Sequence, residues 1–217
     1  MRLYVLSLLA CSIQANATTI LFSDLGTGGS VYDSNNGSTV KGSGSGGNSI
    51  TQARPFTVSG IGDFLLSQLD LGLVTQTGVP TFTISVWTNN AGVPGTELGS
   101  WNVTTSTHLG SCCGLVSQTG ITGVTLTGGD QYWMVVGPQS LSDNSFNQWQ
   151  WNTKGAVADQ LGSLNGGATW INDGNGTNLA FDVLGNSAAP EPGSLLLLGS
   201  GLLGIVGLAV RRKTKVS

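Results

Sequence analysis

The sequence predicts an all-β fold, an antiparallel β-sandwich of jelly-roll type, on three observations. Glycine fills 34 of the 217 positions and charged residues make up only 9% of the chain, a balance typical of secreted β proteins with many turns. Short segments of alternating apolar and polar residues recur between clusters of Gly, Asn, Ser and Pro. Helical periodicity is confined to the two ends. Two packed antiparallel sheets bury such segments most simply.

The first regular strands are expected at 64–73 and 81–87. Both segments alternate apolar and polar residues, which predicts strands with one buried face. The side chains expected to face the core are those of Leu65, Leu69, Leu71, Leu73, Phe82, Ile84 and Val86. A turn cluster at 89–95 then joins the second strand to another that runs through Trp101.

Four further strands are expected at 121–127, 131–137, 147–152 and 179–184. The segment 131–137 is apolar on both parities, so this strand should be central and covered on both faces. Ahead of all these strands, residues 26–48 are rich in Gly, Ser and Asn and poor in apolar side chains. That composition predicts a long loop or an excursion from the domain.

The distribution of charge argues against a nucleic-acid partner. The formal net charge is -3, and between positions 18 and 191 only Lys41, Arg54 and Lys154 oppose the 11 Asp and Glu residues. Binding to a nucleic acid needs a clustered basic surface, which this part of the chain does not supply.

The N-terminal segment 1–17 has the features of a signal peptide. A positively charged start and a short apolar run precede Ala15 and Ala17, the small residues of a signal peptidase site. We therefore expect export by the Sec route and a mature chain that begins at Thr18. The alternative is a lipobox that ends at Cys11, which would become a lipidated N-terminus.

The C-terminal segment predicts one transmembrane helix. Residues 195–210 carry no charge and, as a helix, would span roughly 24 Å, slightly less than a hydrocarbon core. The tail 211–217 follows with the basic cluster Arg211, Arg212 and Lys213. The positive-inside rule places this tail in the cytoplasm and the preceding domain outside.

The linker 186–194 contains Pro190, Glu191 and Pro192. This motif, followed by an apolar Gly-containing helix and basic residues at the very end, resembles the PEP-CTERM sorting signal of Gram-negative bacteria. The resemblance implies that an exosortase recognises the tail, cleaves near the motif, and passes the protein from an inner-membrane intermediate to the cell surface or beyond. The alternative is an ordinary single-pass anchor with the same topology.

A second resemblance covers residues 51–136. The motifs VWTNNAGVPGTEL and GGDQYWMVV are similar to those of the choice-of-anchor R domain of bacterial surface proteins. The resemblance implies that the exported domain, 18–185, is β-sandwich-like. It carries no site residues over to this chain.

The residue types needed for catalysis are sparse. His108 is the only histidine, which excludes a zinc site built from several His residues and an HExxH motif. The segment INDGNGTN, 171–178, lacks the acidic twelfth residue of a calcium loop, so an Asn-Gly turn is expected there. We expect no catalytic residue, no cofactor and no metal.

Cys112 and Cys113 are the only cysteines after the leader. A bond between these neighbours, a bridge between two chains and a pair of reduced thiols all remain open, and a structural role in a loop is expected.

Trp149 and Trp151 share one face if their segment is a strand, and amide side chains flank them. Two indoles bordered by amides are suited to stacking on sugar rings, so carbohydrate binding is one hypothesis for this pair. Packing in the core is the favoured alternative, as it is for most large aromatic residues.

Together these features predict a non-enzymatic protein of the cell surface or of the extracellular biofilm matrix, associated with exopolysaccharide. Signal peptidase and an exosortase would process it. A carbohydrate-binding module is the alternative, and a secreted hydrolase that uses paired carboxylates is a further one.

Overall fold

The computed structural model of the protein describes residues 18–188. This part of the chain folds into fourteen β-strands and one short 3-10 turn, η1 (Ser43–Ser45), which confirms the expected all-β class. In chain order the strands are β1 (Thr19–Ser23), β2 (Gly37–Lys41), β3 (Thr51–Thr57), β4 (Asp63–Leu71), β5 (Leu73–Thr77), β6 (Thr81–Asn90), β7 (Val93–Thr104), β8 (Val116–Thr119), β9 (Thr125–Thr127), β10 (Gln131–Gly137), β11 (Phe146–Gln150), β12 (Val157–Ser163), β13 (Ile171–Thr177) and β14 (Phe181–Ser187).

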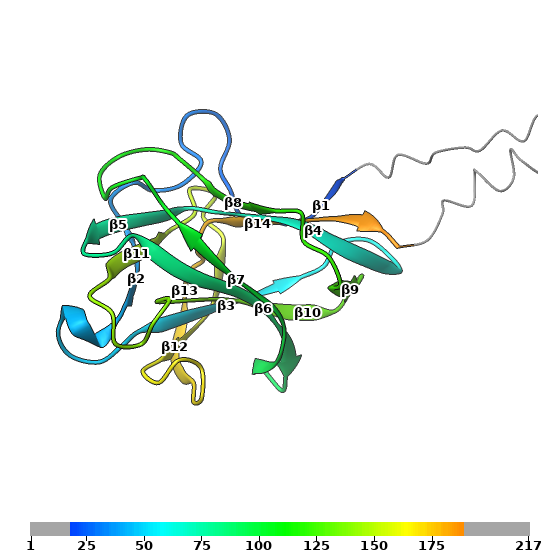
Figure 1. Ribbon diagram of the computed structural model, residues 1–217. Helices are drawn as coiled ribbons and strands as arrows, with labels where there is room; N and C mark the ends of the chain where they lie inside the picture. Colours follow the sequence, from blue (N-terminus) through cyan, green and yellow to red (C-terminus); the bar gives the residue numbers. More distant parts are fainter. Residues whose placement is uncertain (1–17, 189–217) are drawn as a thin grey trace, which may run out of the picture.

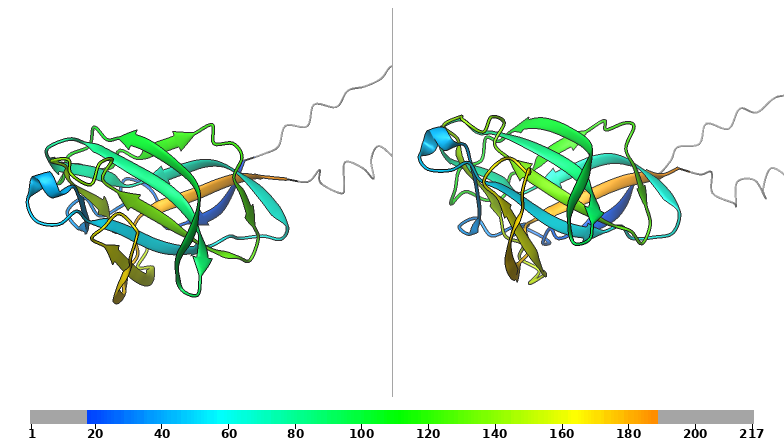
Figure 2. Two further views of the ribbon diagram at one scale, coloured as in Figure 1. Left: turned by 60° about the horizontal axis from the view of Figure 1, so that its bottom comes forward. Right: turned by 90° about the horizontal axis from the view of Figure 1, so that it is seen from below.

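The strands form three antiparallel sheets in two layers (Figures 1 and 2). One layer is the six-stranded sheet β13-β12-β3-β10-β6-β7. The other layer joins the five-stranded sheet β1-β14-β4-β8, in which β9 also pairs with β4, to the three-stranded sheet β2-β11-β5. Gly72 makes the junction between β4 and β5, because its N–H donates to the carbonyl of Ala180 and its carbonyl accepts the N–H of Gln150. The result is a β-sandwich.

The core lies between the two layers and takes side chains from both. Phe82, Ile84 and Val86 of β6 are fully buried, which confirms the alternation expected at 81–87. Leu69 and Phe181 meet them from the opposite layer. Each such side chain contributes roughly 1.5–3 kcal/mol when it leaves water, so this interior supplies most of the stability of the sandwich.

β10 is the central strand that its two apolar faces predict. It pairs with β3 on one side and β6 on the other. Met134 and Val136 face the core between the layers, whereas Trp133 and Val135 belong to a separate apolar cluster on the outer face of the sheet. Both faces of β10 are therefore covered, as expected.

The expected core position of Leu65 is wrong. Leu65 is 45% exposed, and its neighbour Leu66, at 1% exposed, is buried instead. The cause is an irregularity in β4, whose register with β14 shifts by one residue between Gln68 and Leu66. A bulge of this kind reverses which parity of the strand faces the core.

Two further expectations about single segments are corrected. Residues 26–48 are not one long loop, because β2 lies within them and pairs with β11. The strand expected at 121–127 shrinks to β9. Gly120 and Gly123 have φ angles of 68° and 79°, and such left-handed residues interrupt the extended backbone.

The segment 171–178 forms neither a hairpin turn nor a calcium loop. It contains β13, which pairs with β12. Gly174, with φ of 88°, lies in a bulge of β13, where the Asn172 side chain accepts its N–H at 2.7 Å. The Asn-Gly signal therefore marks an irregularity inside a strand, and the two strands form a hairpin that projects from the sandwich (Figures 1 and 2).

The described chain enters and leaves the domain at the same end (Figure 1). The first residue of β1, Thr19, pairs with Gly185 near the end of β14. No helix between residues 18 and 188 is long and apolar enough to cross a membrane. The expected signal peptide, 1–17, and transmembrane helix, 195–210, lie outside the described residues.

Candidate functional site

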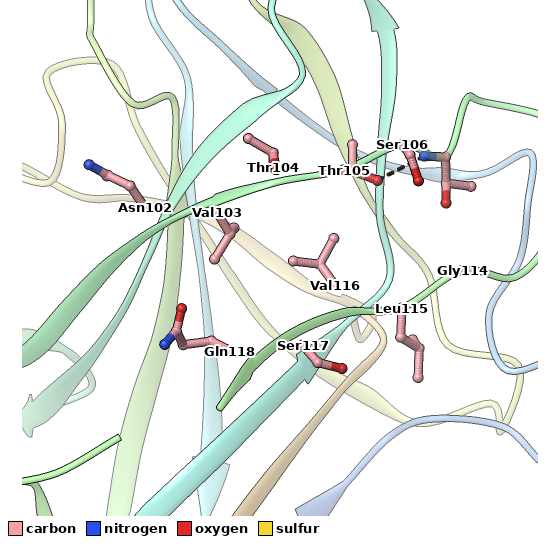
Figure 3. A pocket seen from close by; sticks show the side chains of 11 residues that line it. Asn102, Val103, Thr104, Thr105, Ser106, Gly114, Leu115, Val116, Ser117 and Gln118 are labelled. Carbon is pink, nitrogen blue, oxygen red and sulfur yellow. Dashed lines mark hydrogen bonds between the residues drawn. The ribbon is translucent and has the colours of Figure 1, made fainter. Parts of the chain in front are cut away.

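A groove opens between the end of β7 and the start of β8, and we call it the β7–β8 groove (Figure 3). Residues 102–107 and 114–118 line a volume of about 400 Å³. β7 is an edge strand of the six-stranded sheet and β8 is an edge strand of the five-stranded sheet. The groove therefore lies where the edges of the two layers meet.

Val103 and Val116 form the floor of this groove. Their side chains lie between the two backbone segments in Figure 3, and both belong to the central core. Because side chains alternate along a strand, the neighbours Asn102 and Thr104 turn away from the core and are exposed. The floor is thus apolar and the rim is polar.

Thr105 fixes the wall on the β7 side. Its Oγ1 donates a hydrogen bond to the carbonyl of Leu73 at 2.8 Å. The same oxygen accepts the N–H of Thr107 at 3.1 Å, the bond drawn in Figure 3. The carbonyl of Thr107 then accepts the N–H of Thr75 at 2.9 Å. These bonds hold the chain to β5 as it crosses from one layer to the other.

The wall on the β8 side rests on Asp70. Ser117 Oγ donates to Asp70 Oδ1, and Gln68 Nε2 donates to both Asp70 oxygens at 2.9 and 2.8 Å. Asp70 is only 9% exposed, and its carboxylate oxygens accept the hydrogen bonds from Ser117 and Gln68. It supports the groove without opening into it.

The chemistry of the β7–β8 groove is that of neutral hydrogen bonding. Its lining residues are Asn102, Val103, Thr104, Thr105, Ser106, Thr107, Gly114, Leu115, Val116, Ser117 and Gln118. Hydroxyl and amide groups of this kind donate and accept hydrogen bonds but do not supply a general acid or base near neutral pH. The arrangement suits a neutral polar ligand.

The loop beside this groove carries the cysteine pair. The structure joins Cys112 to Cys113, one of the three states left open by the sequence. Both sulfur atoms lie within 3.6 Å of the carbonyl oxygen of Gly29, and Cys113 packs against the apolar cluster that includes Leu25 and Tyr32. The pair therefore holds its loop against the segment that follows β1.

His108 lies in the same loop and is exposed. Its carbonyl accepts the N–H of Ser111 at 2.9 Å, and its backbone bridges to Thr75. Within residues 18–188, no three His, Cys, Asp or Glu side chains come together in an arrangement that could hold a metal ion.

The hypothesis that Trp149 and Trp151 stack on sugars is wrong. Trp149 is 0% exposed, its Nε1 donates to the carbonyl of Ala180 at 3.1 Å, and its ring meets that of Phe181 edge to face at 5.4 Å. Trp151 is half-buried and packs against the same core. β11 is the middle strand of its sheet, and this face turns inward, so the packing alternative holds.

A comparison with protein-family models adds a finding at the C-terminal end. Residues 188–213 match the PEP-CTERM protein-sorting motif. No curated protein matches the chain. The motif indicates an exosortase-sorted surface protein, which is exported and passes through a membrane-anchored intermediate.

The PEP-CTERM match begins where the folded domain ends. β14 finishes at Ser187, and the N–H of Ala188 donates to the carbonyl of Asp63 at 2.9 Å. β4 runs from Asp63 to Leu71, and Leu71 pairs with Val116 of the groove. At about 3.3 Å per residue, the β7–β8 groove therefore opens roughly 25 Å from the point where the sorting segment attaches.

Several predicted site residues lie outside the described part of the chain. They are Ala15, Ala17, Pro190, Glu191, Pro192, Arg211, Arg212 and Lys213. The PEP-CTERM match includes the last six of these.

Sequence reasoning missed both the β7–β8 groove and a tryptophan-lined hollow on the outer face of the six-stranded sheet. The groove combines segments with ordinary Ser, Thr and Asn composition, so no local feature marks it. One sequence signal could have indicated the hollow: Trp87 follows Thr83 and Ser85 on the polar face of an amphipathic strand. A large aromatic residue on that face points away from the core.

Proposed function

We propose that the protein is a non-enzymatic component of the cell surface or extracellular matrix of a Gram-negative bacterium. It leaves the cytoplasm by the Sec route and is delivered by an exosortase, and its displayed β-sandwich associates with exopolysaccharide. The observation that carries this proposal is the PEP-CTERM motif that starts directly after the last strand.

The geometry of the domain supports display. Both ends of the sandwich lie at the pole to which the sorting segment is attached. The β7–β8 groove and the loop of Cys112 lie toward the opposite pole, where Leu71 of β4 pairs with Val116. A tether at one pole leaves the other pole free to meet molecules outside the membrane.

The lining of the β7–β8 groove supports binding in preference to catalysis. It offers hydroxyl and amide groups over an aliphatic floor, and Asp70 behind it is already hydrogen-bonded. Neutral, hydroxyl-rich polymers match such a surface because each hydroxyl both donates and accepts hydrogen bonds. The resemblance of residues 51–136 to choice-of-anchor R domains stays a prediction that agrees with this role.

The test is the intact mass and the cell fraction of the native protein, compared between cells with and without a functional exosortase. We expect the N-terminus to start at Thr18 in both. Loss of the residues after the Pro190 region, with release from the inner membrane, is expected only where the enzyme is present.

A matched pair of variants sharpens this test. Glu191→Gln changes the sorting motif, whereas Asp159→Asn makes the same chemical change at an exposed residue of β12. We expect only Glu191→Gln to retain the full C-terminal mass in the membrane. An uncleaved tail in the parent protein under all conditions would reduce the assignment to a plain anchor.

A further inference from the structure

The outer face of the six-stranded sheet carries an aromatic surface that faces away from the core. Trp133 of β10 pairs in register with Trp87 of β6, and Val135 pairs with Ser85. Trp133 and Val135 are buried in a cluster against which Trp87 and Trp170 pack from the edge. Tryptophan is thus concentrated on the sheet face that sandwich packing leaves outside.

A hollow lies beside Trp87, and we call it the Trp87 groove. Its volume is about 190 Å³, and its lining residues are Thr51, Thr83, Ser85, Trp87, Glu97, Val135, Gly137, Pro138, Gln139, Leu141 and Gly166. The floor comes from β6 and β10, where Thr83 pairs with Gly137. The loop between β12 and β13 forms one rim through Gly166.

The ring of Trp87 is fixed before any ligand arrives. Its Nε1 donates to Ser85 Oγ at 2.7 Å, and its ring meets that of Trp170 edge to face at 6.4 Å. With its N–H satisfied inside the sheet, Trp87 presents carbon surface to the groove. A preorganised aromatic ring loses little conformational entropy on binding.

Close packing of glycines shapes the rim. A Cβ at Gly166 would lie 3.0 Å from the side chain of Leu141, and one at Gly167 would lie 3.2 Å from the ring of Trp170. Both glycines have positive φ angles, 71° and 97°. The backbone of this loop therefore approaches Leu141 and Trp170 as only glycine permits.

The polar groups of the groove are hydroxyl, amide and carboxylate. Glu97 and Gln139 are exposed at its sides, and Thr83 Oγ1 donates to Asn102 Oδ1 at 2.9 Å. The lining contains no Lys, Arg or His. An anionic ligand would meet the Glu97 carboxylate without a compensating cation, so the charge favours a neutral one.

We propose that the Trp87 groove is a binding site for a neutral polysaccharide. A sugar ring stacks its C–H face on the Trp87 indole while Glu97, Gln139 and the floor hydroxyls bond its hydroxyl groups. The inference rests on the proposed matrix function and names a second contact with the polymer, separate from the β7–β8 groove. The tryptophan proposed to stack on sugars is thus Trp87 of β6, in place of Trp149 and Trp151.

The experiment is affinity electrophoresis of the mature protein purified from its host, in native gels with increasing polysaccharide. Dextran, hydroxyethyl cellulose and galactomannan serve as neutral probes, and alginate serves as the anionic comparator. We expect retardation by at least one neutral probe. Trp87→Ala should weaken it about tenfold or more, as expected for an aromatic anchor, and Glu97→Gln should weaken it by a smaller factor.

Two further variants keep the outcome clear. Thr83→Leu fills the groove while Trp87 and its bond to Ser85 remain, so it should also weaken retardation strongly. It tests the site even if Trp87→Ala proves poorly folded. Ile61→Ala removes a side chain that is 98% exposed and far from the groove, and it should bind like the parent.

Each result bears on one proposal. Unchanged retardation of both Trp87→Ala and Thr83→Leu would overturn the site while leaving the matrix role intact. Retardation by alginate alone would overturn the neutral class of ligand. A parent protein that no polysaccharide retards, yet that loses its tail by exosortase action, would refute the inference and leave sorting established.

Discussion

At the scale of single residues, Arg54 shows how the layers are joined by a buried cation. It is 0% exposed, and burial lowers its pKa to about 10 while the charge of Asp173 raises it. Its guanidinium donates to the carbonyl of Ala53 at 2.8 Å and to Ser38 Oγ at 2.9 Å. Ser38 belongs to β2, so this contact connects the six-stranded sheet to the other layer.

The bond to Ser38 should therefore matter more than a typical surface contact. Ser38→Ala leaves a buried charged donor with one partner fewer, and we expect the free energy of unfolding to fall by about 1–3 kcal/mol. In an Arg54→Met background the same change should cost much less, because no charge is left unpaired. Urea denaturation of the four proteins measures the coupling. Equal costs in both backgrounds would show that the bond is not what Ser38 contributes.

At the scale of elements, the bulge in β4 decides which leucine is in the core. Leu66→Ala should lower the free energy of unfolding by about 2–5 kcal/mol, because it opens a cavity between the layers. Leu65→Ala should cost less, about 1 kcal/mol or below, because Leu65 is 45% exposed and its loss opens no cavity between the layers. Thermal and urea unfolding of the two variants distinguish these outcomes. A larger loss of stability for Leu65→Ala than for Leu66→Ala would show that Leu65 faces the core and that β4 has no bulge.

The strands that the sequence predicted are those with strong local patterns. β6 and β10 alternate or are apolar throughout, so burial follows directly from their residues. β2 contains only one buried apolar residue, Val40, and forms because β11 lies beside it. The sequence of β2 by itself gives no sign that β11 will pair with it, so this strand could not be predicted locally. The bulge in β4 likewise depends on its register with β14.

At the scale of the whole molecule, the Trp87 groove forms only where segments that are distant in the sequence meet. Trp149 lies in β11 and Trp151 in a single bridge to Leu179 just after it, and both pack against the core between the layers. The Trp87 groove needs β6, β10 and the loop before β13, which are separated by tens of residues. The tryptophans and the amphipathic strands can be read from the sequence, but the packing of the two layers decides which strand presents an indole on the outer face.

Two carboxyl groups, those of Asp24 and Asp182, make the stability of the whole domain depend on pH. Burial raises the pKa of Asp24 and of Asp182 above 3.8, with hydrogen bonds from Asn178 to Asp24 and from Ser23 to Asp182 opposing that shift. These carboxyls lie near the end of β1 and in β14, and Lys154 donates to Ser23 beside them at 3.0 Å. They therefore belong to the junction of β1, β14 and the segment before β12.

A raised folded-state pKa means that the folded protein binds more protons than the unfolded chain. Through these two groups, the free energy of unfolding should be greatest at and below about pH 4 and should fall as the pH rises through the folded-state pKa values. Asp182→Asn removes one ionisation, so its stability relative to the parent should increase over that same rise in pH. Urea midpoints measured from pH 4 to pH 7.5 test this, with exposed Asp159→Asn as the control. A difference between Asp182→Asn and the parent that stays constant with pH would show that Asp182 titrates alike in the folded and unfolded chains, and that burial at this junction does not govern its charge.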